Sequence, residues 1–155
     1  MPRYNAVMMN DRRHARSLAM QALCQAEVLR EAFLNQLVEF LKDESPPDQV
    51  ERYAKKLATE SWEHLEQIDQ HIQAASENWK VARMAPVDRN ILRVAMCELL
   101  HHPETPPNVV IDEAVELGKL YGTAESGAFI NGVLDAAYKA LSSVGSTTEP
   151  ASTTN

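Results

Sequence analysis

Three arginines stand close together near the start of the chain, in a segment with the period of an α-helix. Arg12, Arg13 and Arg16 fall in its first turns and, at about 100° per residue, share one arc beside the apolar stripe. Cations at this end oppose the helix macrodipole. Guanidinium groups donate planar sets of hydrogen bonds to phosphates and stack on unpaired bases. The cluster therefore indicates an RNA-binding surface or, equally, arginines that are solvated or paired with acids on a neighbouring helix.

The net charge of the chain is −7, which argues against bulk electrostatic attraction to nucleic acid. The charge is unevenly distributed, because Arg3 and the three arginines above all precede residue 17, where Asp11 is the sole acid. A local basic patch on an acidic protein favours selective contact with RNA over sequence-blind coating.

Other side chains that often carry chemistry are scattered along the chain. They are His14, His64, His71, His101, His102, Cys24 and Cys97. Because no HExxH or CxxC spacing occurs, neither a metal site nor a disulfide is predicted, and the thiols are expected to be buried and reduced. No glycine-rich phosphate loop, G-x-S-x-G motif or selectable acid–base pair is present, so neither a cofactor nor an enzymatic activity is expected.

Apolar residues recur with the helical period along most of the chain, and only 5 of its 155 residues are glycine. This pattern predicts an all-α fold. The predicted helices cover residues 11–29, 31–43, 45–78, 87–101, 105–121 and 123–141. The 45–78 segment is compatible with one long helix or with two placed end to end.

Two glycines and one aromatic residue carry more specific expectations. Gly122 is predicted to end the 105–121 helix in the left-handed conformation. Gly132 lies inside the last helix, where glycine costs stability, so the close approach of another helix is predicted there. The periodicity favours Phe129 as a core residue over an aromatic face offered to a base.

The pattern also predicts the organisation of the chain. Residues 1–10 are expected to form a flexible N-terminal arm, residues 11–141 a helical domain, and residues 142–155 a disordered polar tail. The helical domain is expected to divide into subdomains of about 11–78 and 79–141. Neither a signal peptide nor a membrane span is predicted, so a cytoplasmic protein is expected.

Three blocks of the sequence resemble the NusB family. They lie at residues 13–23 (RHARSLAMQAL), 88–99 (DRNILRVAMCEL) and 107–135, which contains IDEAVELGK and FINGVLD. The blocks occur in the family's order and spacing, and the likeness covers about residues 11–141. The resemblance implies about seven helices in two small helical bundles packed together.

The resemblance also implies a function. NusB proteins pair with NusE, which is also a small-subunit ribosomal protein, and the pair binds the boxA element of nascent RNA. The complex supports antitermination by RNA polymerase, notably in ribosomal RNA operons. A non-enzymatic factor without cofactor is therefore implied, and the choice between a monomer and a homodimer stays open.

The family's functional positions are carried over by the resemblance alone. The implied RNA-binding residues are Arg12, Arg13, Arg16, Glu125, Ser126 and Phe129, and Asp88 matches an acidic position at the NusE interface. Gly127 and Ala128 stand where relatives carry His and Lys, so this part of the RNA surface has lost charge. Cys24 replaces an aromatic residue that is common at its position.

Two alternative functions remain open at this stage. One is the NusB-like RNA-binding module of an rRNA cytosine methyltransferase, which would need a large α/β catalytic domain that these 155 residues do not show. The other is a helical protein-interaction module without RNA binding. A titration with boxA RNA distinguishes this second alternative from an antitermination factor.

Overall fold

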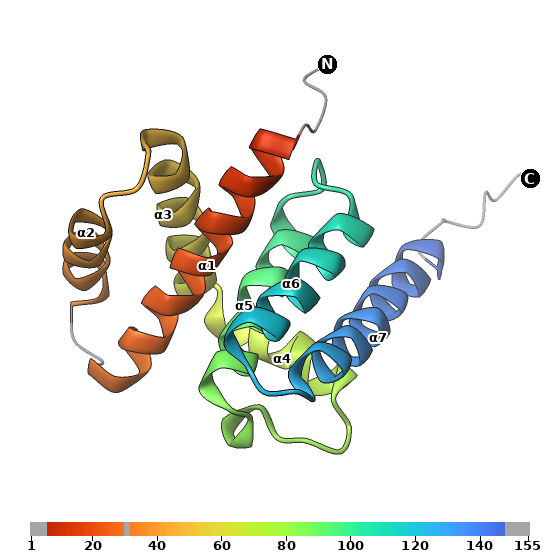
Figure 1. The fold of residues 1–155 in the computed structure, drawn as a ribbon. Coiled ribbons are helices and arrows are strands. Elements are labelled where there is room, and N and C mark those ends of the chain that lie inside the picture. Colours follow the sequence, from red (N-terminus) through yellow and green to blue (C-terminus); the bar gives the residue numbers. More distant parts are fainter. Residues whose placement is uncertain (1–5, 30–31, 148–155) are drawn as a thin grey trace, which may run out of the picture.

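The computed structural model describes residues 6–29 and 32–147, and within them the chain forms seven α-helices and one short 3-10 helix but no strand (Figure 1). The predicted all-α class is therefore confirmed. The elements are α1 (Ala6–Leu29), α2 (Phe33–Glu44), α3 (Asp48–Glu63), α4 (Leu65–Ala75), η1 (Val81–Arg83), α5 (Pro86–His101), α6 (Pro107–Tyr121) and α7 (Ser126–Thr147). None of the described helices combines the length and the apolar character needed to cross a lipid bilayer.

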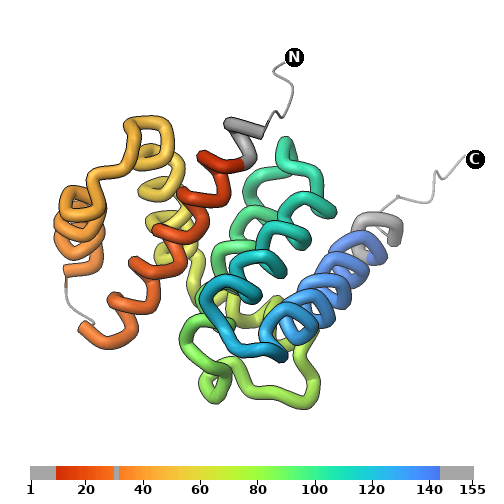
Figure 2. Tube along the Cα trace, viewed as in Figure 1, coloured from red at the N-terminus to blue at the C-terminus, as the bar shows by residue number. Residues whose placement is uncertain are grey.

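The helices form two groups (Figure 2), and their buried side chains make a continuous apolar core. In the first group α1 packs on α2 and α3, and in the second α5 and α7 pack on each other and on both α4 and α6. Helix α5 joins the groups, because it contacts α1 and α3 as well as its own neighbours. The predicted subdomain limit after residue 78 would place α4 in the first group, whereas α4 packs mainly against α5 and α7.

The segment between residues 45 and 78 contains two helices, which resolves the alternative left open by the sequence. Helix α3 ends at Glu63 and α4 starts at Leu65, with His64 at φ −105° and ψ 22° between them. The change of direction lets Ile68 and Ile72 of α4 enter the core beside α5 and α7. No proline or glycine marks this break, so the sequence carried no local signal for it.

Both terminal helices extend beyond their predicted limits. Helix α1 already includes residues 6–10, which were assigned to the N-terminal arm, and α7 continues through residues 142–147 of the expected tail. Ala and Met at the start of α1 are good helix formers, so they extend a helix that is already nucleated by packing. The remaining parts of the predicted arm and tail, residues 1–5 and 148–155, lie outside the described residues.

The close approach of two helices occurs at a different glycine from the one predicted. A Cβ built on Gly132 would meet no atom within 4 Å, so the expected approach at Gly132 is wrong. A Cβ on Gly118 of α6 would instead lie 2.8 Å from Cδ1 of Ile130 on α7. The absence of a side chain at Gly118 therefore lets α6 and α7 pack closely.

Candidate functional site

Arg16 belongs to the interior of the protein. Only 2% of the residue is exposed, and its Nε and Nη2 donate hydrogen bonds of 2.5 and 2.9 Å to the carboxylate of Glu98 on α5. The hydroxyl of Tyr53 donates a further hydrogen bond of 2.9 Å to the same carboxylate. Arg16 is therefore paired with an acid on a neighbouring helix, as one of the two interpretations of the sequence expected. The direct contact of Arg16 with RNA stays a prediction, and the burial of its side chain disfavours it.

Arg13 has a mixed environment. Its Nε and Nη2 donate hydrogen bonds of 2.8 and 3.0 Å to the buried carboxylate of Glu113 on α6. The hydrogen bond to Glu113 is the main reason that the pKa of Arg13 is raised. Arg13 thus links α1 to α6, and the carboxylate of Glu113 balances its charge. Its side chain is still 37% exposed and therefore also faces solvent.

Arg12 lines an open cleft between α1 and α3. Its guanidinium carbon lies 3.5 Å from the centroid of the Tyr53 ring, at the distance of a cation–π contact. The cleft measures about 360 Å³, and we call it the cationic cleft. Its lining residues are Asp11, Arg12, Gln49, Arg52, Tyr53 and Lys56.

Arg52 and Lys56 are candidate functional residues that the sequence interpretation missed. Both are exposed, and neither forms an ion pair with another residue in the described part of the chain. Their i, i+4 spacing on α3 places them on one helix face, which is a detectable signal for a basic patch. The many acids of the same segment made this face resemble an ordinary solvated surface.

A second surface contains three of the residues that the resemblance carried over. Asp88, Glu125 and Phe129 line a pocket of about 320 Å³ together with Trp79, Arg83, Met84 and Ala85. We call it the aromatic pocket, because the rings of Trp79 and Phe129 meet edge to face with centroids 6.3 Å apart. Trp79 is 60% exposed, whereas Phe129 is half-buried and packs against the core as the periodicity predicted.

Ser126 is placed differently from its neighbours on α7. Its side chain is buried, and its hydroxyl accepts a hydrogen bond of 2.9 Å from the backbone N–H of Thr123. Ser126 therefore fixes the connection between α6 and α7, and its predicted contact with RNA is not supported by exposure.

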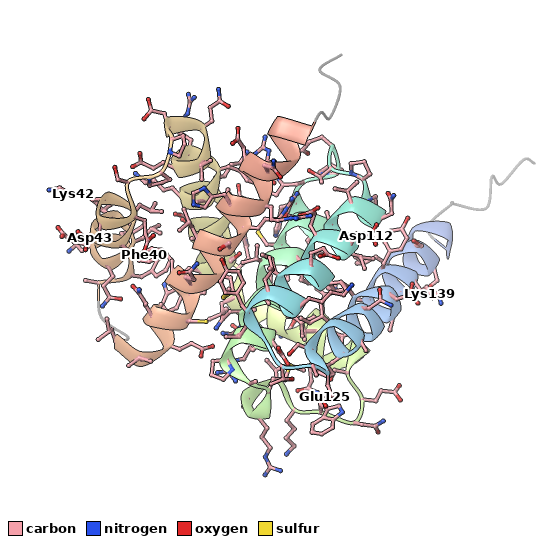
Figure 3. The ribbon with its side chains drawn as sticks, in the orientation of Figure 1. Phe40, Lys42, Asp43, Asp112, Glu125 and Lys139 are labelled. Atoms are coloured by element: carbon pink, nitrogen blue, oxygen red, sulfur yellow. The ribbon has the colours of Figure 1, made fainter. Side chains whose placement is uncertain are left out.

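The predicted RNA-binding residues do not gather on one surface. In Figure 3 Glu125, which lines the aromatic pocket, lies at one end of the molecule. The first turns of α1, which carry Arg12, lie at the other end. The fold thus provides a cationic surface at one end and an aromatic surface flanked by carboxylates at the other. Any single ligand that contacts both must run along the length of the helices.

Gly122 precedes the part of the chain that lines the aromatic pocket, and its position has room only for a glycine. Its backbone has φ −97° and ψ −158°, so the predicted left-handed conformation is wrong. A Cβ at this position would lie 2.6 Å from Cβ of Ser126 and 2.8 Å from the carbonyl oxygen of Gly118. The chain therefore passes too close to both helices for any side chain.

We expect Gly122→Ala to lower the free energy of unfolding by about 1–3 kcal/mol, because the added methyl group overpacks this turn. Urea denaturation monitored by circular dichroism measures the change. Gly132→Ala is the matched control, since it adds the same methyl group where no atom lies within 4 Å, and it should leave stability unchanged or higher. Equal destabilisation by both substitutions would contradict the steric explanation.

An ionic network holds the two helical groups together beside the aromatic pocket. The carboxylate of Glu27 on α1 accepts hydrogen bonds from Arg89 at 2.7 and 2.6 Å and from Arg93 at 2.6 Å. Arg93 also donates two hydrogen bonds of 2.8 Å to Asp69 on α4. Burial alone would raise the pKa of Glu27, but the hydrogen bonds and charges of its partners, Arg89 first, lower it overall.

This network should make stability depend on acid pH. A carboxyl group with a lowered folded-state pKa stabilises the fold above its unfolded value, here 4.5, and loses that contribution as pH falls through the folded value. We therefore expect Glu27→Gln to be less stable than the parent at neutral pH but to lose less stability below pH 4.5. Thermal unfolding between pH 3 and 7 tests this, with the exposed Glu39→Gln as control. Parallel curves for parent and Glu27→Gln would refute it.

The structure is an all-α fold of two small helical groups, with a cationic cleft and a separate aromatic pocket. Comparison with solved structures gives its class. T. maritima NusB superimposes with a TM-score of 0.76 at 40% identity, covering 83% of this chain and 90% of that one. A structure of the antitermination factors NusB and NusE in complex with dsRNA gives 0.78 at 32% identity, covering 86% of this chain and 99% of its match.

Sequence comparison identifies the family. The NusB family model matches residues 13–139, and the chain belongs to the NusB family. It is 46% identical over 129 residues to the transcription antitermination protein NusB of Anaeromyxobacter dehalogenans, with 83% of this chain and 90% of the relative covered. It is 40% identical over 130 residues to that of Syntrophus aciditrophicus, with 84% and 81% covered. The family consists of antitermination factors rather than enzymes.

Proposed function

We propose that this chain is a transcription antitermination factor that binds boxA-type RNA together with NusE. In this role it joins the RNA polymerase antitermination complex and supports processive transcription of ribosomal RNA operons, which places it in the cytoplasm. The main support is the 32% identity to the NusB of a complex with NusE and dsRNA, because the match spans 99% of that chain. The aligned region also covers 81–90% of each named relative.

The cationic cleft is the proposed contact for the RNA backbone. Arg52 and Lys56 carry charges that no carboxylate of the described chain pairs with, so a phosphate can bind them without displacing an internal partner. Arg12 is held by the ring of Tyr53, which fixes its orientation before RNA arrives. Phosphate contacts of this kind supply a large share of the affinity of nucleic-acid binding.

The aromatic pocket is proposed for a base and for the partner protein. The exposed ring of Trp79, beside Phe129, offers a surface for stacking an unpaired base. Asp88 and Glu125 line the same pocket, and their charges repel phosphates, so contact here should involve bases or protein groups rather than the RNA backbone. Asp88 is the proposed contact with NusE.

A titration of labelled single-stranded boxA RNA, with and without NusE, tests the function. We expect weak binding by this chain alone, tighter binding when NusE is present, and weaker binding of a scrambled RNA under both conditions. Fluorescence anisotropy at two salt concentrations measures all three. If NusE has no effect and the scrambled RNA binds equally, the proposal is wrong, and a helical interaction module without RNA specificity becomes the better interpretation.

A further inference from the structure

Three residues that are far apart in the sequence meet where α3 passes the end of α5. They are Glu60 on α3, Cys97 on α5 and His102 directly after α5, and their potential ligand atoms all lie within 4.8 Å of one another. Nε2 of His102 lies 2.5 Å from Oε2 of Glu60, and Sγ of Cys97 lies 3.8 Å from the same oxygen. Sequence spacing predicted no metal site, because the fold rather than a local motif brings these side chains together.

We propose that Glu60, Cys97 and His102 bind a single divalent transition-metal cation, with Zn²⁺ as the preferred ion. Thiolate, imidazole and carboxylate are the three ligand types that zinc accepts in proteins, and mixed sets of them form tetrahedral sites. The site is distinct from the cationic cleft and from the aromatic pocket, since none of its residues lines either.

Two of the three distances between the ligand atoms come close to those of a tetrahedral site after a small adjustment, and the third, between Sγ of Cys97 and Nε2 of His102, is at most 4.8 Å. Zinc bonds of about 2.3 Å to sulfur and about 2.0–2.2 Å to nitrogen and oxygen require ligand atoms roughly 3.4–3.6 Å apart. The sulfur–oxygen distance of 3.8 Å is already close to that value. The nitrogen–oxygen distance of 2.5 Å must open by about 1 Å, which a rotation of the partly exposed Glu60 side chain can supply.

A second carboxylate orients the histidine for this role. Nδ1 of His102 lies 3.1 Å from Oε1 of Glu104, so the ring is held with Nε2 directed at Glu60. Metal-binding histidines usually bond a carboxylate through the ring nitrogen that does not bind the metal, which fixes the tautomer and raises ligand basicity. The rings of Tyr53 and His102 also meet edge to face, with centroids 6.0 Å apart, and this contact restricts rotation of the histidine.

The partly exposed side chain of Glu60 gives an ion access to the site. Cys97 and His102 are buried, whereas the side chain of Glu60 is 26% exposed, so an ion can enter past Glu60 and keep a water as its fourth ligand. Formation of the metal–sulfur bond then releases the thiol proton to solvent. The bound ion would cross-link α3 to the end of α5 and thereby join the two helical groups.

Cobalt titration of the chelator-treated full chain tests the proposal, because Co²⁺ occupies zinc sites and a thiolate ligand gives it a near-ultraviolet charge-transfer band. We expect one equivalent of Co²⁺ to produce this band and added Zn²⁺ to abolish it. The band should persist in Cys24→Ser and disappear in Cys97→Ser. Glu60→Gln, at a partly exposed position, should weaken Co²⁺ binding at least tenfold, and Zn²⁺ should raise the Tm of the parent.

Several outcomes would overturn the site. One is the lack of a thiolate band at stoichiometric Co²⁺, and another is a band that Cys24→Ser removes. Binding without a thiolate band would assign the ion to surface histidines, such as the stacked pair His64 and His101, instead. The chain has 2 cysteines, so Cys97 is the one thiol that remains in Cys24→Ser. A thiolate band in Cys24→Ser therefore assigns the sulfur ligand to Cys97 even if Cys97→Ser does not fold.

Discussion

Arg16→Ala is expected to lower the free energy of unfolding by about 3–5 kcal/mol, because it leaves a buried carboxylate without its counter-ion. Glu98 is 0% exposed, and its carboxylate accepts two hydrogen bonds from Arg16 and one from Tyr53. Of these three hydrogen bonds, the substitution leaves the one from Tyr53. Chemical denaturation at neutral pH measures the loss. An effect of this size would unfold a large fraction of a marginally stable chain at physiological temperature.

Two control variants separate this explanation from a general effect of losing a cation. Arg52→Ala removes an exposed arginine and should change stability by no more than about 0.5 kcal/mol. The double variant Arg16→Met, Glu98→Leu removes both charges and should recover most of the stability that Arg16→Ala loses. If Arg16→Ala is as stable as the parent, the pair does not hold α1 to α5, and the direct RNA contact implied by the family resemblance regains support.

The second large effect is expected in RNA binding. The double variant Arg52→Ala, Lys56→Ala should lower affinity for boxA RNA, in the presence of NusE, by about tenfold, since two exposed ion pairs with phosphates contribute roughly 1–2 kcal/mol together. Both side chains are exposed on α3, so the fold and the contact of Arg12 with Tyr53 should be unaffected. Fluorescence anisotropy at fixed salt measures the change.

A matched control keeps the net charge equal. Lys42→Ala, Lys139→Ala also removes two exposed cations, but these lie on α2 and α7, on opposite sides of the molecule and away from the cationic cleft (Figure 3). This control should bind RNA almost as well as the parent. An equal loss in both double variants would show that overall charge, rather than the cleft, determines affinity.

The helical period of the sequence was sufficient to predict the class of fold and most helices. It was insufficient wherever a residue's role depends on a partner distant in the chain. Arg16 lies beside the apolar stripe of α1, a position that fits either an exposed or a buried arginine, and its partner Glu98 is 82 residues away. The same period could not reveal that α3 brings Arg52 and Lys56 beside Arg12.

Glycines and helix ends show the same limit. Gly118 and Gly132 both lie inside helical periods, and the sequence offered no reason to assign the close approach of α6 and α7 to Gly118. The break at His64 likewise follows from the need to bury Ile68 and Ile72 against the second helical group, not from a local signal. Family resemblance placed Asp88, Glu125 and Phe129, which the structure then brought together in one pocket.

The salt dependence of RNA binding tests most directly whether the cationic cleft contacts the RNA backbone. For single-stranded RNA each phosphate contact contributes about 0.7 to the slope of log affinity against log salt. We predict that Arg52→Ala, Lys56→Ala, measured with NusE over a range of potassium chloride concentrations, reduces that slope by about 1.4 relative to the parent. Identical slopes for parent and variant would mean that no phosphate binds Arg52 or Lys56.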